Sequence, residues 1–268
     1  MRFPLRLALD LTRVVIAQKL FGVERIPLIW PIDLAKVPVS ENVHGGGAAD
    51  SSRDLLAMEL VRSSKAPIVW IGGDTPLHYP RIGHLTREII DLGRTVFVEM
   101  DGRLLRRRIH EFRPVSRLYL VLPLLGLQDA HDLRSAHPGS FRATIESIRT
   151  AKLSGFHVCV ETPVAAGMSA EELRGLANFI ATLDVEGWIQ KRLAVNEAGR
   201  PSEETLAAAR ELISDAGWKS FSKHLTLVAP HPEFACGAAD NGTSVPPAVL
   251  PNHDNTNLPT REESVRAL

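Results

Sequence analysis

The segment 66-APIVWIGGDTPLHYPRI-82 is the part of the sequence that most constrains the fold. It begins with a run of apolar and β-branched residues, which is typical of a buried strand. The run ends at two glycines and an acid, Gly72, Gly73 and Asp74, and a helical pattern follows over residues 81–93. A buried strand that leads through a tight turn into a helix predicts a β–α unit, with the glycines at the carboxyl end of the strand.

The alternation of strand and helix patterns continues on both sides of this segment. Further strands are predicted at residues 26–32, 94–102, 116–126, 156–162 and 185–191, and a last one at 224–230. Further helices are predicted at residues 103–112, 139–155, 169–184 and 202–217. Six or seven such units imply parallel strands joined by right-handed crossovers. We therefore expect an α/β fold, a partial or complete TIM-type (β/α) barrel, with an open doubly wound sheet as the alternative.

Residues at the predicted helix ends agree with this reading. Gly93, Gly155 and Gly217 each follow a helical pattern, at the position where a left-handed backbone is easiest for glycine. Ser169 and Ser202 precede helical patterns and are followed by acids, as expected of N-caps.

Sequence outside the repeat sets the expected domain limits. Residues 1–26 combine regularly spaced charges with apolar residues, which predicts an amphipathic helix packed on the barrel, with contact to a membrane surface as the alternative. The barrel is expected over residues 27–229. Residues 230–268 are rich in Pro and Asn without periodicity and predict a disordered tail. The stretch 44-HGGGAADSS-52 is expected to be a short flexible loop, and it lacks the ending of a phosphate-binding loop.

The charge balance and the cysteine content of the sequence bear on which partners and which structural class to expect. The 268 residues include 31 basic and 31 acidic side chains, so no overall basic field indicates a nucleic acid. The 2 cysteines, Cys159 and Cys236, lie far apart, which argues against a disulfide framework and fits a reducing cytoplasm. A small molecule is the expected partner, and the sequence specifies no protein partner.

Candidate ligand-binding residues lie where predicted strands end, because ligands of parallel α/β folds bind there. These polar or glycine positions are Asp33, Gly72, Gly73, Asp74, Glu99, Asp101, Glu161, Thr162, Gln190 and Lys191. Strand alternation puts Glu99 and Glu161 on the face opposite Val98 and Val160, and hence inside the barrel if the valines pack on helices. Internal ion pairs, for example to Lys191, and ligand binding are both open for these acids.

Taken together, residues 3–190 resemble the radical S-adenosylmethionine (SAM) superfamily, and are similar in particular to its hopanoid-biosynthesis group, the adenosylhopene transferases. Residues 4–29 are similar to that group's N-terminal helix and first strand, and 96-VFVEMDGRLL-105 stands where the family has a strand ending in Thr-Asn-Gly. Residues 131–162 are similar to its His-Asp, Gly-x-Phe and Gly-Phe-x-Val series. The resemblance implies that Gly72, Gly73 and Asp74 hold SAM, with Asp74 in place of the usual glutamate.

The sequence departs from this family at the loop that should bind the [4Fe–4S] cluster. The family has three cysteines after the first strand, whereas 33-DLAKVPVSENVHGGG-47 has none. A [4Fe–4S] cluster of this kind needs three thiolates, so we do not expect one here. Three readings remain: a cluster-less barrel with a small-molecule-binding, scaffold or regulatory role, an enzyme that uses its lumen acids without a radical, and a radical SAM enzyme whose cluster is held in an unusual way.

Overall fold

Six parallel strands alternate with helices in the computed structural model, which describes residues 9–13, 16, 28–37, 46–73, 76–192 and 201–214. All of these residues belong to one compact unit, Met1–Gly237. The strands are β1 Ile29–Asp33, β2 Ile68–Gly72, β3 Thr95–Glu99, β4 Leu118–Pro123, β5 His157–Val164 and β6 Gly187–Arg192. The helices are α2 Gly46–Ser64, α3 Ile82–Asp91, α4 Gly102–Arg108, α5 Gln128–Arg134, α6 Ser140–Leu153, α7 Ala170–Ala181 and α8 Glu203–Ser214, with short 3-10 turns η1 Pro76–His78 and η2 Ile109–Glu111.

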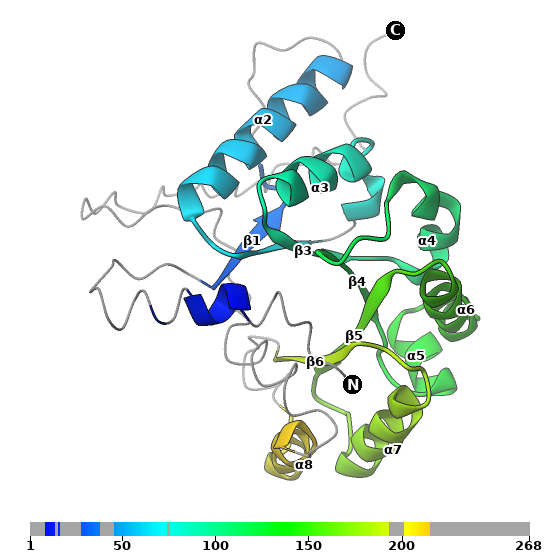
Figure 1. Ribbon diagram of the computed structural model, residues 1–268. Helices are drawn as coiled ribbons and strands as arrows, with labels where there is room; N and C mark the ends of the chain where they lie inside the picture. The colour runs from blue at the N-terminus through cyan, green and yellow to red at the C-terminus, as the bar shows by residue number, and fades with distance from the viewer. Residues whose placement is uncertain are drawn as a thin grey trace, which may run out of the picture. The chain divides into compact units, whose positions relative to one another are not determined.

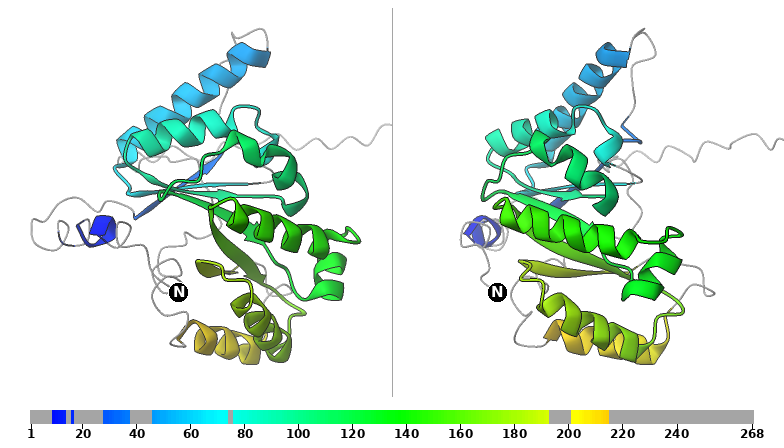
Figure 2. Two further views of the ribbon diagram at one scale, coloured as in Figure 1. Left: turned by 45° about the vertical axis from the view of Figure 1, so that its right-hand side comes forward. Right: turned by 90° about the vertical axis from the view of Figure 1, so that its right-hand side faces the viewer.

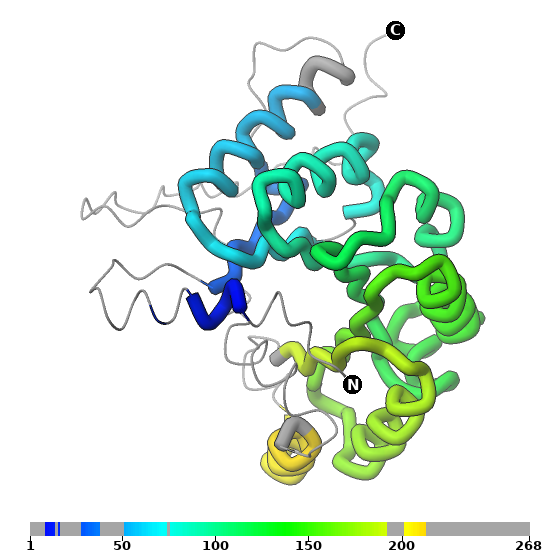
Figure 3. The backbone as a smooth tube through the Cα atoms, in the orientation of Figure 1, coloured from blue at the N-terminus to red at the C-terminus, as the bar shows by residue number. Residues whose placement is uncertain are grey.

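The sheet order confirms the prediction of a partial β/α barrel. Neighbouring strands follow the order of the chain, β1-β2-β3-β4-β5-β6, and every pair is parallel. A doubly wound sheet would reverse its order at a switch point, so that alternative is wrong for the described strands. The sheet curls into a half-barrel with its helices along the outer side (Figures 1 and 2), and the backbone passes repeatedly from a strand to a helix and back (Figure 3).

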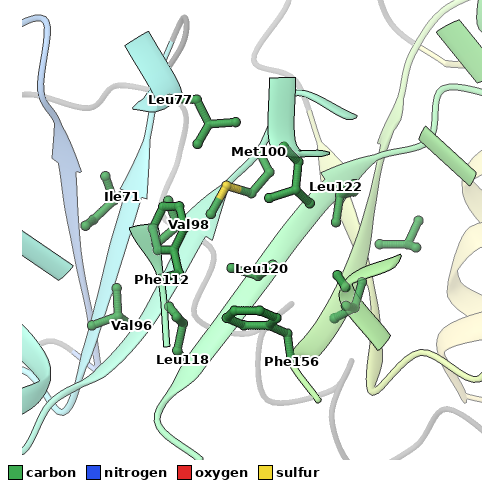
Figure 4. Close-up of a cluster of buried hydrophobic side chains, with 14 of the residues drawn as sticks. Ile71, Leu77, Val96, Val98, Met100, Phe112, Leu118, Leu120, Leu122 and Phe156 are labelled. Carbon is green, nitrogen blue, oxygen red and sulfur yellow. The ribbon is translucent and has the colours of Figure 1, made fainter. Parts of the chain in front are cut away.

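The outer face of the sheet carries the main apolar core. Val96, Val98, Leu118 and Leu120 point away from the lumen, are at most 1% exposed, and pack with apolar residues of the covering helices. Figure 4 shows these side chains together with Phe156. The predicted alternation is therefore confirmed, because Val158 and Val160 also belong to this core.

The inner face carries a second, smaller core below the strand ends. Four rings stack across β2 to β5: Trp70 on Phe97 at 5.5 Å between centroids, Phe97 on Tyr119 at 4.6 Å, and Tyr119 on His157 at 5.1 Å. Leu11, from the helical segment at residues 9–13, packs into the same core. Among the described residues, the lower lumen is therefore filled by side chains, which leaves the upper lumen, toward the carboxyl ends of the strands, as the place for a ligand.

Most predicted helix ends are confirmed. Gly93 and Gly155 have φ of +78° and +82°. Ser169 Oγ accepts a hydrogen bond from Glu172 N at 3.0 Å, and Ser202 Oγ accepts one from Thr205 N at 3.1 Å. Gly217 lies outside the described residues.

One local prediction was wrong, and the helices α2 and α5 were not predicted. The stretch 44–52 is not a loop over its described part, because α2 begins at Gly46. The glycines there indicated a loop by propensity alone, and packing in the folded chain can override a propensity of this size. The helix α5, Gln128–Arg134, was not predicted, since its 7 residues are too few for a helical pattern to stand out.

Several predictions fall outside the described residues. These are the strand at 224–230, the tail at 230–268 and most of the N-terminal helix at 1–26. Within the described part of the chain, none of the helices has the length and apolar character needed to cross a bilayer.

Candidate functional site

A cavity of about 260 Å³ opens at the carboxyl ends of β2 to β5. Of the site residues predicted from the sequence, Gly73, Glu99, Asp101 and Glu161 line it. Gly72 lines a neighbouring cavity instead, and Asp74 lies outside the described residues. The remaining lining residues are Pro76, Met100, Gly102, Arg103, Val121, Pro123, Leu125, His131, Ser135, His137, Ser140 and Thr144.

Lys191 joins the two lumen acids. Its Nζ lies 3.0 Å from Glu99 Oε1 and 3.1 Å from Glu161 Oε1, so one ammonium bridges β3 and β5 from the end of β6. Glu99 Oε1 also accepts a hydrogen bond from Trp70 Nε1 at 2.8 Å, and Glu99 Oε2 accepts one from Gly73 N at 3.3 Å. The ion pair to Lys191, one of the two outcomes open from the sequence, is thus present.

This cluster shifts the protonation of its members. Burial, together with the negative charge of Glu99, raises the pKa of Glu161 to about 7, although Lys191 opposes the shift. Burial alone would lower the pKa of Lys191, but the two carboxylates outweigh it and raise that pKa. Lys191 is therefore a fixed cation, whereas Glu161 can hold or release a proton near neutral pH.

The two glycines at the end of β2 make room for carboxylates. A Cβ on Gly72 would lie 2.9 Å from the Glu99 carboxyl carbon, and a Cβ on Gly73 would lie 2.5 Å from Asp33 Oδ1. Gly73 also has a φ of +108°, which side-chain-bearing residues rarely adopt. The strand end thus faces the protein's own acids, an arrangement that favours a cationic ligand group and disfavours an anionic one.

Asp101 has a structural role at the rim of the cavity. It is the N-cap of α4, where Oδ1 accepts a hydrogen bond from Arg103 N at 2.7 Å, and its Oδ2 lies 2.9 Å from Arg103 Nη2. Burial would raise the pKa of Asp101, but these contacts with Arg103 outweigh it and lower the pKa. Asp101 is therefore ionised and already neutralised by its neighbour.

Sequence reasoning missed a buried pair, His131 and Ser140. His131 Nδ1 accepts a hydrogen bond from Leu125 N at 3.1 Å, so the proton of the neutral ring is on Nε2, which donates to Ser140 Oγ at 3.1 Å. Burial lowers the pKa of His131 and keeps the ring neutral. Ser140 can then donate its own hydroxyl proton into the cavity, which both residues line. The sequence feature that could have indicated this pair is Asp132, whose carboxylate accepts hydrogen bonds from Gly139 N and Phe141 N at the start of α6 and so fixes the segment between His131 and Ser140.

Three other strand-end candidates do not reach this cavity. Thr162 lies on the outer face, where its hydroxyl donates to Leu124 O at 2.9 Å and accepts from Trp188 Nε1 at 2.9 Å. Gln190 pairs in register with Thr162 and shares that face. Asp33 lines the neighbouring cavity and pairs with Lys36 at 3.2 Å.

The neighbouring cavity, of about 220 Å³, lies where the loop after β1 begins. Its lining includes Asp33, Arg53, His78 and Tyr79, and none of the lining residues is a cysteine. The one described cysteine, Cys159, is fully buried in β5, and burial raises the pKa of its thiol well above the usual value. Within the described ranges, no three His, Cys, Asp or Glu side chains are placed to share a metal ion. These residues do not fit a [4Fe–4S] cluster, which needs thiolate ligands.

Comparison with known proteins places the fold. Residues 50–180 match the sequence profile of the Radical SAM superfamily, and no curated protein matches the chain in sequence. The SAM-bound crystal structure of Streptococcus suis SuiB is 13% identical, with a TM-score of 0.56 over 82% of this chain and 52% of SuiB. A second SuiB structure is 14% identical, with a TM-score of 0.55 over 82% of this chain and 51% of that one.

A structure of TYW1 with a lysine-pyruvate adduct bound is 15% identical, with a TM-score of 0.48 over 76% of this chain and 81% of TYW1. The chain spans about half the length of SuiB. At 13–14% identity the two SuiB structures show a shared fold, and the similarity to the Radical SAM superfamily in sequence lies in the profile match over residues 50–180.

Proposed function

We propose that this chain is a radical SAM-like barrel without a [4Fe–4S] cluster, which binds a small molecule in the cavity lined by Glu99 and Glu161 and acts as a binding, scaffold or regulatory protein. The observation that carries the proposal is the contrast between two places on the barrel. The loop after β1 has no cysteine, while the carboxyl ends of β2 to β5 keep a cavity with a few convergent polar groups on apolar walls.

The ligand is a separate question. SAM is the ligand that the resemblance implies, and the acids beside Gly72 and Gly73 suit its ammonium group but not its carboxylate. The link to hopanoid biosynthesis rests on the sequence similarity over residues 3–190 and is part of the proposal. We expect weak binding of SAM and S-adenosylhomocysteine, because no cluster anchors the amino-acid end, and calorimetric titration measures this.

Native mass spectrometry of the full chain, after incubation with a metabolite extract, tests the cavity itself. Ser135→Trp places a large side chain at the half-buried rim of the cavity and should abolish retention of the bound small molecule. Ser64→Trp is the matched control, because Ser64 is also half-buried, also donates to the carbonyl three residues earlier and lies at the end of α2. Identical retention in both variants, or none in wild type, contradicts the proposal.

Glu161 supports a second function, an acid–base enzyme that needs no radical. A carboxyl group whose pKa is about 7, in a cavity and beside a fixed cation, is suited to transfer protons at neutral pH. Under this function, wild type consumes a metabolite from the extract and Glu161→Gln does not, although both still bind it. Equal consumption by the two proteins, or none by either, removes this candidate.

A further inference from the structure

Glu161 has one carboxylate oxygen that nothing in the described structure satisfies. Glu99 Oε1, Glu99 Oε2 and Glu161 Oε1 each lie within reach of a donor, from Trp70, Gly73 or Lys191. Glu161 Oε2 is buried and has no hydrogen-bond partner among the described residues, and the residue as a whole is 8% exposed. An unpaired buried carboxylate oxygen is costly, so a donor brought by a ligand would be stabilised there.

The charges around this oxygen favour a cation over a neutral donor. When Glu161 is ionised, it and Glu99 share the positive charge of Lys191, which leaves one negative charge uncompensated among the ion pairs of the described residues. The other charged lining pair, Asp101 and Arg103, neutralises itself. A cation at Glu161 therefore completes the charge balance of the cluster, whereas an anion would add to the excess.

The walls of the cavity indicate the rest of the ligand. Beside the acids lie apolar groups from β4 and from the segments that follow β3 and β4, namely Met100, Val121, Pro123 and Leu125. A volume of about 260 Å³ holds a compact body of a few carbon atoms beyond the charged head.

We propose that the ligand of this cavity carries a primary ammonium group on a compact apolar body, and that the ammonium binds at Glu161. This inference rests on the proposed function, since it names the ligand class of the same cavity. The new hydrogen bond goes to Glu161 Oε2, so Lys191 keeps its contacts with Glu161 Oε1 and Glu99.

Binding of an ammonium group must then depend on pH. Because the pKa of Glu161 is about 7 without a ligand, ammonium binding at lower pH releases a proton, and affinity rises as pH increases through 7. A primary alkylamine itself stays protonated throughout this range. Among the described residues, the other titratable or charged groups that face Glu161 or line the cavity are Glu99, Lys191, Asp101, Arg103, His131 and His137.

Three probes of one shape and different charge test the ligand class. Cyclohexylamine, cyclohexanol and cyclohexanecarboxylate share a ring, and ligand-observed NMR on the full chain at pH 6 and pH 8 measures their affinities. We expect cyclohexylamine to bind about tenfold or more tightly than the other two at pH 8, a difference of about 1.4 kcal/mol. Its affinity should be several times higher at pH 8 than at pH 6, and that of cyclohexanol should not change.

Variants assign the effect to Glu161. Glu161→Gln keeps the shape of the side chain and should remove both the preference for the amine and its pH dependence. Glu146→Gln is the control, because Glu146 is also ion-paired, with Arg106 and Arg142, but lies outside the cavity. His137→Gln should keep the pH dependence. The comparison of cyclohexylamine affinity at pH 6 and pH 8 uses wild type alone, so it tests the proposal even if Glu161→Gln does not fold.

The outcomes separate this inference from the proposed function. Binding of the alcohol or the carboxylate that equals or exceeds that of the amine, and that Ser135→Trp abolishes, overturns the ammonium proposal but leaves a ligand-binding cavity. An amine affinity in wild type that does not rise between pH 6 and pH 8 also overturns it. If none of the probes shows binding that Ser135→Trp removes, the cavity is not a ligand site, and both proposals fail.

Discussion

The two faces of the half-barrel are built from the same strands, but the outer face is an apolar core, whereas the inner face also carries a cluster of charged side chains. On the outer face, Val96, Val98 and Leu120 are apolar and covered by helices. On the inner face, apolar and aromatic side chains fill the lower lumen, and Glu99, Glu161 and Lys191 gather at the carboxyl ends. Alternation along a strand therefore determines which face of the sheet a side chain lies on. The role of an inner side chain depends, in addition, on which side chains of the other strands contact it.

The outer core should be the most sensitive to substitution. Leu120→Ala in β4 removes a side chain with no exposed surface and leaves a cavity. We expect a loss of about 2–5 kcal/mol in the free energy of unfolding, measured by urea denaturation. A loss below about 1 kcal/mol would mean that the outer face is loosely packed, and would contradict the distinction between a tightly packed outer core and a ligand-binding inner face.

Removal of the shared cation should have the next largest effect. Lys191→Met leaves two neighbouring carboxylates without their partner, and we expect a loss of about 1–3 kcal/mol at pH 8. The loss should shrink at pH 5, because protonation of Glu161, whose pKa is about 7, relieves its repulsion with Glu99. Equal losses at both pH values would show that Lys191 stabilises the fold by its packing and not by its charge.

Glu161→Gln should stabilise the protein, but only at higher pH. The folded-state pKa of Glu161, about 7, lies above its ordinary value of 4.5, so the folded chain binds this proton more tightly than the unfolded chain does. Wild-type stability should therefore fall as pH rises from about 5 to 8, by about 1–3 kcal/mol from this group.

The glutamine variant lacks this fall, so its unfolding free energy should exceed that of wild type at pH 8 and match it near pH 5. Parallel curves of stability against pH for the two proteins would show that Glu161 is not held in a shifted state.

Removal of an exposed ion pair should change the free energy of unfolding least, and it serves as the comparison for Lys191→Met. Arg142 pairs with Glu146 on the surface of α6, and its side chain is 86% exposed. Arg142→Ala should change the free energy of unfolding by less than about 0.5 kcal/mol at either pH. A loss as large as that of Lys191→Met would remove the distinction between the lumen cluster and an ordinary surface pair.

Much of this architecture follows from the sequence, and the failures have physical reasons. The run 66–73 and its repeats predicted the parallel strands, and alternation placed Glu99 and Glu161 on the inner face because the period of a strand is fixed. The helix α2 was not predicted at all, and its glycines led to the prediction of a loop at 44–52, because they mask a helix that forms in the context of the folded chain. The unsatisfied oxygen of Glu161 could not be predicted, because it depends on how far Lys191 reaches across from β6.

The superfamily resemblance calls for three cysteines on the loop after β1, where residues 33–47 include none, and we therefore propose that this barrel holds no [4Fe–4S] cluster. The most direct measurement is the iron and acid-labile sulfide content of the full chain after anaerobic reconstitution with iron and sulfide. The account predicts far less than one equivalent of either per chain, because the loop at 33–47 has no cysteine and Cys159 is buried with its pKa raised by that burial. A content near four iron and four sulfide per chain, retained after desalting, would contradict it.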